Sequence, residues 1–337
     1  MRTLPRWAWH AGGWSLLLAT LLLAFSVGQF PVQPAALLHA IGWQLFGIGD
    51  PPAPAVQVAL WHIRLPRVLA AVLIGAVLSA AGAAYQAMFR NPLVSPDILG
   101  VSAGAGLGAS LGLFLGLPML LVQGVAFAGG LGAVGLVCLV AALVRRHDPV
   151  LVLVLAGVAV SALLGAGISL LKLLADPYTQ LPSITFWLLG GLNAVVIDDL
   201  KVTAPLLLIG LLPLVLLRWR VNLLGLGDEE ASALGVAVTP LRWTLIAAAT
   251  LCTAAAVSLA GIIGWVGLVV PHIARLLVGA DFRRLLPASL LLGASFLLAA
   301  DTLARTLAPI ELPLGILTAF VGVPCFLLVL ARSERRP

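Results

Sequence analysis

Charged residues are scarce in this chain, and their scarcity excludes an ordinary soluble fold. They account for 9% of the 337 residues, whereas hydrophobic residues account for 61%. A soluble domain usually carries about 25% charged residues, which this chain cannot supply for a polar surface. The sequence therefore predicts an all-α integral membrane protein.

Lysine is nearly absent, and with it any nucleotide-binding loop. A phosphate-binding loop of the Walker type needs a lysine directly after a glycine, but Lys172 follows Leu171 and Lys201 follows Leu200. The 5 histidines are scattered, and neither a Ser-His-Asp arrangement nor an HExxH spacing occurs. The sequence therefore predicts no ATP site, no catalytic residue, no metal site and no cofactor, so we do not expect an enzyme.

Cysteine is rare as well. The 3 cysteines, Cys138, Cys252 and Cys325, lie inside apolar runs and show no CxxC or Cys/His spacing. We therefore expect small buried hydrophobic residues rather than disulfides or metal ligands.

Carboxylates inside the apolar runs are also few. Asp97, Asp176, Asp301 and Glu311 all fall near predicted helix ends. A proton- or sodium-coupled carrier normally keeps an ionisable group near the bilayer midplane, and an intramembrane enzyme needs paired catalytic groups. Neither pattern is evident, so an ion-coupled secondary carrier working without an ATPase is kept only as the alternative function.

Long charge-free runs dominate what is present. The run from Val68 to Phe89 begins directly after Arg64 and Arg67 and ends at the polar turn that starts with Arg90. A run of this length can cross a bilayer core of about 30 Å as a helix. Cutting all such runs at glycine, proline and polar clusters predicts about ten transmembrane helices. They lie near residues 14–30, 67–89, 98–117, 119–144, 150–172, 201–218, 240–260, 263–278, 285–303 and 313–331.

Two long runs must each hold a pair of helices. We expect the run 243–274 to break near Gly261–Gly264 and the segment 98–144 to turn near Pro118. The 35 glycines are many for helix interiors. Those within 100–108 and 157–167 indicate either close packing of neighbouring helices or a pathway wall that moves.

Charge sets the orientation. With the N-terminus inside, the outer loops receive only Arg64, Arg67, Lys172, Lys201 and Arg305, and the other fourteen of the 19 basic residues lie inside. This split follows the positive-inside rule and predicts that both termini are cytoplasmic. The basic residues occur singly or in pairs, which indicates membrane loops rather than a nucleic-acid surface. The first apolar run has no clear small-residue cleavage site, so we expect a retained helix rather than a signal peptide.

The inner loop near 223–238 contains a short predicted helix. Asp228 is placed as its N-cap, and Glu229 and Glu230 favour the positive end of the helix that they begin. Ala231 and Leu234 are expected to share one face, and Gly235 can end the helix. Such a helix is too short to span the membrane, and a plain surface helix and a docking helix both fit it.

Blocks in order along the chain resemble the FecCD-type permeases, the membrane subunits of type II ABC importers for iron–siderophores, haem and vitamin B12. They cover almost the whole chain, from about residue 60 to 330, and their ordered combination is specific. The blocks are 64–67 (RLPR), 90–93 (RNPL) with 99–104 (LGVSAG), 155–159 (LAGVA), 186–191 (FWLLGG), 224–231 (LGLGDEEA), 260–272 (AGIIGWVGLVVPH), 300–305 (ADTLAR) and 311–315 (ELPLG).

The resemblance implies one transmembrane permease domain over 1–337, in a bacterial inner membrane, that pairs with a second copy of itself. It also implies two cytoplasmic ATPase subunits that grip a coupling helix. The implied coupling positions are Leu226, Gly227, Asp228, Glu229, Glu230, Ala231, Leu234 and Gly235. Small and apolar residues at 156–172 and 314–328 would line the substrate path.

The resemblance further implies a periplasmic or lipid-anchored substrate-binding protein as a partner. Its acidic residues would be received by outer arginines, which match Arg64, Arg67 and Arg305 here. Anchoring to lipid headgroups is the other interpretation of these arginines. The implied cargo is an iron-chelate type compound, namely a ferric siderophore, haem or vitamin B12, and the chain itself does not identify it.

Overall fold

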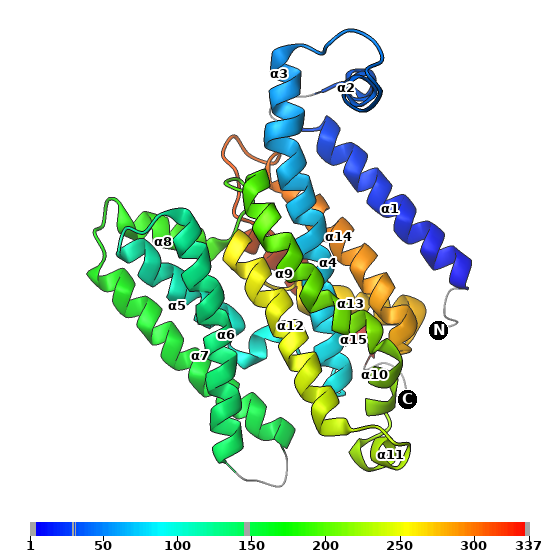
Figure 1. Cartoon of the computed structure of the whole chain (residues 1–337), viewed down its shortest axis with the longest axis vertical. Coiled ribbons are helices and arrows are strands. Elements are labelled where there is room, and N and C mark those ends of the chain that lie inside the picture. The colour runs from blue at the N-terminus through cyan, green and yellow to red at the C-terminus, as the bar shows by residue number, and fades with distance from the viewer. Residues whose placement is uncertain (1–4, 29, 31, 145–148, 334–337) are drawn as a thin grey trace.

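The computed structural model describes residues 5–28, 30, 32–144 and 149–333, and within these ranges it is helical without any strand (Figure 1). Two short helical turns, η1 (Val58–Arg64) and η2 (Pro96–Leu99), join longer helices. The helices are α1 (Arg6–Ser26), α2 (Pro34–Phe46), α3 (Pro54–Gln57), α4 (Leu65–Met88), α5 (Val101–Phe114), α6 (Met119–Leu143), α7 (Pro149–Leu174), α8 (Gln180–Leu189), α9 (Ile197–Leu216), α10 (Arg218–Leu224), α11 (Asp228–Ala233), α12 (Val238–Ala260), α13 (Val266–Val278), α14 (Phe282–Ala304) and α15 (Leu314–Ser333).

Each of the ten predicted spans coincides with a helix, although their lengths differ. Seven stretches of the described chain are long and apolar enough to cross a membrane, and they correspond to α1, α3–α4, α6, α7, α9, α12 and α14. Helices α5, with 14 residues, and α13, with 13 residues, are shorter. A 14-residue helix rises only about 21 Å. The all-α fold is therefore confirmed over the described residues, with seven stretches suited to cross a membrane, whereas ten crossings remain a prediction.

The two predicted breaks are present. Helix α5 ends at Phe114 and α6 begins at Met119, directly after Pro118. Helix α12 ends at Ala260, and residues 261–264 are not helical before α13 begins at Val266. Pro118 has no backbone N–H to donate to the preceding turn, so a helix does not run through it without losing a hydrogen bond. Gly261 adopts a positive φ of 69°, which costs glycine little and ends α12.

A single long helix forms the centre of the molecule. Helix α3, the wide π-helical turn η1 and α4 follow one another without a break from Pro54 to Met88. The wide turn ends two residues before Pro66, which lacks the N–H that a regular helical turn requires. In Figure 1 this helix rises above the other long helices and carries α2 beside its upper end. We call this end of the molecule the α3 end and the opposite end the α11 end.

The central helix packs backbone to backbone against its neighbours. A Cβ atom on Gly75 would lie 2.2 Å from the carbonyl oxygen of Gly293 in α14, and one on Gly82 would lie 1.8 Å from that of Gly267 in α13. Real Cβ atoms do not approach this closely, so glycine is required at these crossings. The predicted glycine contacts exist elsewhere too, since a Cβ on Gly104 would lie 2.3 Å from the Gly129 carbonyl oxygen in α6.

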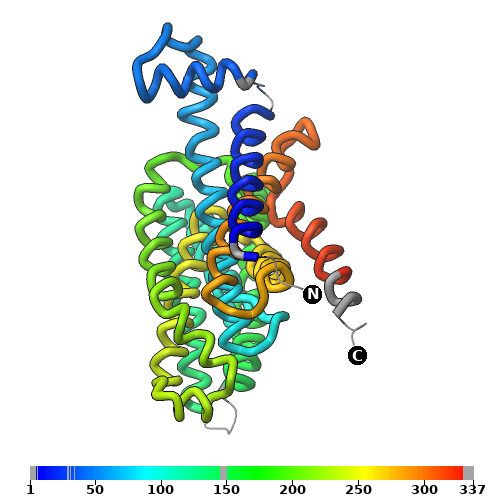
Figure 2. Tube along the Cα trace, turned by 90° about the vertical axis from the view of Figure 1, so that its right-hand side faces the viewer, coloured from blue at the N-terminus to red at the C-terminus, as the bar shows by residue number. Residues whose placement is uncertain are grey.

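The remaining helices flank this centre. Helices α5, α6, α7 and α8 form a group on one side, while α1 and α15 lie near α14 on the other (Figures 1 and 2). Helices α2, α8 and α10 were not predicted, because each is too short to span a bilayer; α2 and α8 lie within the longer charge-free runs 7–49 and 177–197, where no charge marks them as separate helices. Five of the basic positions predicted inside, Arg2, Arg145, Arg146, Arg335 and Arg336, lie outside the described residues.

Candidate functional site

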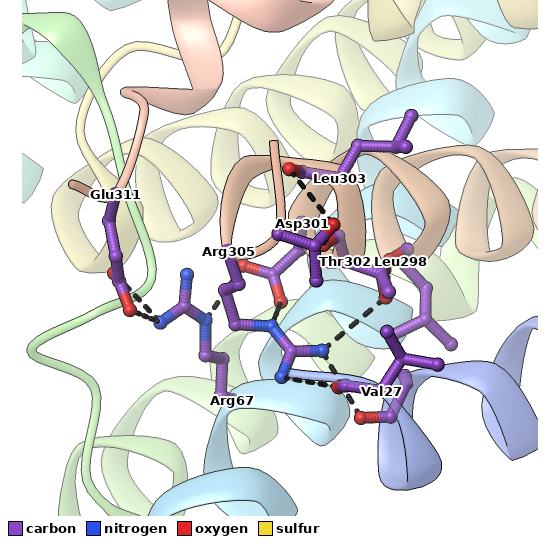
Figure 3. A network of polar contacts seen from close by, with 10 residues as sticks. Val27, Arg67, Leu298, Asp301, Thr302, Leu303, Arg305 and Glu311 are labelled. Carbon is purple, nitrogen blue, oxygen red and sulfur yellow. Dashed lines mark hydrogen bonds and ion pairs between the residues drawn. The ribbon is translucent and has the colours of Figure 1, made fainter. Parts of the chain in front are cut away.

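Three arginines that lie far apart in the sequence meet at the α3 end. Arg64 ends η1, Arg67 lies in the first turn of α4, and Arg305 follows α14. Their exposed fractions are 5%, 7% and 7%, respectively, so all three are buried (Figure 3 shows Arg67 and Arg305). Buried guanidinium groups need partners, because transferring an unpaired charge from water to the protein interior is strongly unfavourable.

Asp301 joins two of these arginines. Arg67 Nε donates to Asp301 Oδ1 at 2.8 Å, and Arg305 Nε forms an ion pair with Asp301 Oδ2 at 3.2 Å (Figure 3). The Asp301 side chain is fully buried. Since Asp301 lies in the last turn of α14 and Arg305, four residues later, directly follows that helix, one turn brings the two together.

Glu311 is the second carboxylate of the cluster. It lies in the segment between α14 and α15, and Arg67 Nη1 donates to its Oε1 and Oε2, both at 2.9 Å (Figure 3). In contrast to Asp301, 38% of the Glu311 side chain is exposed. Arg67 therefore connects α4 both to α14 and to the segment that leads into α15.

The end of α1 and the segment after it supply the remaining partners. Arg64 donates to the backbone oxygens of Phe25 and Phe30, and Arg305 Nη2 donates to the backbone oxygen of Ala24 at 3.2 Å. The last carbonyl groups of a helix have no partner within the helix and carry the negative end of its dipole. The arginines therefore cap α1, and they fix it to α4 and α14.

Gly28 makes room for this arrangement. A Cβ atom at this position would lie 3.1 Å from Arg64 Nη2 and 3.3 Å from Arg305 Nη1. Both guanidinium groups therefore approach the backbone of the segment after α1 more closely than most side chains would allow.

Convergence of the three arginines agrees with their predicted position at one rim, but their side chains are not free at the surface. The internal partners of the arginines were not predicted from the sequence. Asp301, four residues before Arg305 at the end of the predicted helix 285–303, was a signal for the first of them. Glu311 gave no comparable signal, because it lies 244 positions from Arg67. Docking of a partner on these arginines stays a prediction.

A cavity of about 390 Å³ opens beside the cluster. Arg67 and Glu311 lie on its wall, and the starts of α6 and α9 contribute Gln123 and Asp199, whose side chains lie 3.4 Å apart. The wall also includes the ends of α5 and α12, so these helix ends meet at one end of the molecule. Its other residues come mainly from α8 and the segments 190–195 and 312–314.

The predicted path-lining helices contribute little to this cavity. Of the residues at 156–172 and 314–328, only Leu314 lies on its wall. Instead, α7 exposes Val158 and Leu163, and α15 exposes Phe320, to the outside of the single chain. A role of these helices in lining a path stays a prediction that concerns more than one chain.

The predicted inner helix is present as α11, with one correction. Its N-cap is Gly227, with a φ of 126°, rather than Asp228. Asp228 is the first helical residue, and both of its carboxylate oxygens accept hydrogen bonds from Arg242 Nη2 at 3.0 Å. Arg90 Nη2 lies 3.8 Å from Asp228 Oδ1. The carboxylate therefore links α11 to α12 and to the end of α4 instead of capping its own helix.

Other expectations for α11 are partly met. Ala231 is fully buried, whereas Leu234 is exposed, so the two do not share a buried face. The reason is that the helix ends at Ala233 and Leu234 already lies in the turn that closes it. Gly235 has a φ of 82° and ends the helix as predicted. Leu226, Glu229 and Glu230 are exposed beside it.

Metal-ligating side chains do not gather in the described part of the chain. No group of three or more His, Cys, Asp or Glu residues there could hold a metal ion. Cys252 is buried as expected, while Cys138 and Cys325 are partly exposed.

Comparison with known proteins gives consistent matches over nearly the full length. The model of the FecCD transport family matches residues 16–332. The chain is 36% identical over 321 residues to the molybdate import system permease protein MolB of Haemophilus influenzae, covering 95% of this chain and 94% of that protein. It is 42% identical over 288 residues to the hemin transport system permease protein HmuU of Yersinia pestis, covering 82% and 86%.

A solved structure has the same fold. It is described as an inward-facing conformation of a metal-chelate type ABC transporter. The match has a TM-score of 0.82 at 35% sequence identity and covers 95% of this chain and 98% of the other.

Proposed function

The chain belongs to the FecCD transport family and is the permease subunit of an ABC importer, and from this premise we propose that it carries an iron-chelate type substrate. A ferric siderophore, haem or vitamin B12 would be taken from a substrate-binding protein and released into the cytoplasm. The match over residues 16–332 carries the proposal. The hemin and metal-chelate relatives favour this class, whereas the molybdate relative makes an oxyanion the competing cargo.

We propose that the energy comes from two ATPase subunits that hold α11. Support comes from the lack of a Walker lysine in the sequence and from the fixing of α11 by Asp228. A helix that is tied to both α4 and α12 transmits movement to them, whereas a slack loop would not. Exposed Glu229 and Leu234 leave a free surface on which an ATPase can bind.

The proposed assembly contains two copies of this chain in the bacterial inner membrane. Each chain would cross the membrane ten times, with both termini in the cytoplasm and the α3 end outside. Convergence of Arg64, Arg67 and Arg305 at this end, with Arg67 on the wall of the cavity, supports a rim where a binding protein delivers its cargo. The exposed apolar residues of α7 and α15 would then face the second copy and the path between the two.

In the proposed cycle, the loaded binding protein docks at the α3 end, and ATP binding and hydrolysis move the two α11 helices together and apart. The central path then opens alternately to each side. The chain performs no covalent step in this cycle, so its residues act by positioning the partners and by shaping the path.

Affinity purification from native membranes tests the assembly directly. Gentle extraction of the tagged chain, followed by identification and counting of the co-purifying proteins, should recover two copies of this chain with two copies of a Walker-containing ATPase. Recovery without any ATPase, under conditions that preserve other membrane complexes, would instead favour the ion-coupled carrier. ATP-dependent uptake of ferric siderophore, haem, vitamin B12 and molybdate into proteoliposomes that contain the complex then identifies the cargo.

A further inference from the structure

Arg67 is held by two carboxylates that differ in how they are anchored. Asp301 belongs to α14 and is fully buried, so it cannot leave Arg67 without moving a helix. Glu311 belongs to a non-helical segment, and 38% of its side chain is exposed. Of the two carboxylates, only Glu311 can be withdrawn by a local rotation of its side chain.

Glu311 also leaves part of the guanidinium group unused. Both of its oxygens contact Nη1, while Asp301 contacts Nε, so Nη2 takes part in neither bond (Figure 3). The strongest arginine–carboxylate pairs use two parallel bonds from two nitrogens. An incoming carboxylate that bonds both Nη1 and Nη2 would therefore bind Arg67 better than Glu311 does.

The surroundings of the pair decide what this incoming group is. Arg67 and Glu311 both line the cavity, but so does Asp199, and among the described residues no other arginine or lysine lines it. A free anion in the cavity would meet two carboxylates and one arginine that is already paired. A carboxylate on a docking protein is favoured, because other contacts of the two proteins offset this repulsion.

We propose that Glu311 occupies, within the same chain, the place on Arg67 that an acidic side chain of the docked substrate-binding protein takes over. This inference rests on the importer function proposed above. In the free permease Glu311 keeps Arg67 neutralised and buried. On docking the partner's carboxylate displaces Glu311 into solvent, while Asp301 stays in place and keeps Arg67 oriented.

The exchange has a consequence for α15. Glu311 lies three residues before Leu314, where α15 begins. The backbone there is fixed by bonds from Leu312 N to the Ala304 oxygen at 3.1 Å and from Leu314 N to the Gly190 oxygen at 2.9 Å. The Arg67–Glu311 ion pair is the side-chain connection that accompanies them. Release of this ion pair frees the start of α15 to move, so docking of the binding protein changes the mobility of this helix.

Glu311→Gln tests the exchange, because glutamine keeps the size of the side chain but no longer competes as a charge. The probe is the proposed substrate-binding protein, isolated as a further protein that co-purifies with the tagged chain from native membranes and titrated against the permease–ATPase complex in nanodiscs. We expect about fivefold tighter binding than in the wild type, the effect of removing one partly exposed ion pair. Asp198→Asn is the matched control, since Asp198 pairs with Lys201 at 2.7 Å on the surface and should leave binding unchanged.

Two further measurements distinguish the replacement of Glu311 by the partner's carboxylate from a general loosening of the structure. In an Arg67→Lys background, which keeps the charge beside Asp301 but lacks the two-nitrogen fork, the gain from Glu311→Gln should shrink. Hydrogen exchange at the amides of Leu312 and Leu314 should be faster in Glu311→Gln without any partner, and unchanged in Asp198→Asn.

The outcomes are distinguishable. If the binding protein binds the wild-type complex and Glu311→Gln binds it equally or more weakly, the exchange is wrong and the importer function stands. If no binding protein co-purifies with the wild-type complex and none binds to it, the proposed importer function fails. The exchange then fails with it.

Discussion

Replacing Asp301 with asparagine perturbs the buried cluster at its centre. Asp301 Oδ1 lies 2.8 Å from Arg67 Nε and Oδ2 lies 3.2 Å from Arg305 Nε, with the carboxylate fully buried. Asparagine keeps the shape and removes the charge, so Arg305 loses its carboxylate and Arg67 keeps only Glu311. Removing one partner of a buried ion pair typically costs about 3–5 kcal/mol. We expect Asp301→Asn to lower the free energy of unfolding by an amount in this range.

The midpoint of unfolding of the purified chain in mixed micelles, titrated with SDS and followed by circular dichroism, measures this loss. Asp198→Asn removes the same charge from an exposed pair, whose contribution is at most about 1 kcal/mol. Combining Asp301→Asn with Arg305→Gln should recover part of the loss, because the second arginine is no longer left buried without a carboxylate. If Asp301→Asn were as mild as Asp198→Asn, the cluster would have to be hydrated, and the reasoning from burial would be refuted.

Three further predictions concern other parts of the fold. Gly75→Ala should destabilise the chain by about 1–3 kcal/mol or more, because the new Cβ would lie 2.2 Å from a backbone oxygen of α14. Gly132→Ala, whose Cβ meets nothing within 4 Å, is the control in the same SDS titration. Asp228→Asn should weaken co-purification of the ATPase or raise its activity without transport, since α11 loses its connection to Arg242. Asp198→Asn, which removes a charge from an exposed pair outside the α11 segment, should do neither. Arg64→Gln should speed limited proteolysis between α1 and α2, because the Phe25 oxygen at the end of α1 and the Phe30 oxygen beyond it each lose a hydrogen bond from Arg64. An unchanged cleavage rate would contradict the capping role.

The long helices were predictable because the property that defines them is local. A charge-free run such as Val68 to Phe89 is visible in the sequence, and its position matches α4 closely. The breaks before α6 and α13 were also predictable, because a single residue in the sequence, Pro118 or Gly261, marks the place where each helix is interrupted. Helices α2 and α8 were missed, because a helix shorter than the bilayer leaves the same apolar pattern as a loop between spans.

The candidate site was only partly predictable, because the contacts that define it are not local in the sequence. That Arg64, Arg67 and Arg305 lie at one rim followed from alternating crossings of the membrane. Their burial did not, since Arg67 meets Asp301 across 234 positions of sequence and only tertiary packing brings them together. The prediction that Asp228 caps α11 was wrong, because Arg242 competes for its carboxylate. A charged donor is preferred over the helix's own backbone N–H groups.

The continuous helix from Pro54 to Met88 joins the two ends of the molecule as one body. Its 35 residues span about 50 Å. Arg67 lies near the α3 end, and just beyond the other end Arg90 approaches Asp228 of α11. Thermodynamic linkage makes any coupling along this rod reciprocal: if occupancy at α11 changes the affinity of the arginine cluster by some factor, occupancy of the cluster changes the affinity at α11 by the same factor. Measuring either affinity with the other site empty and filled therefore determines both.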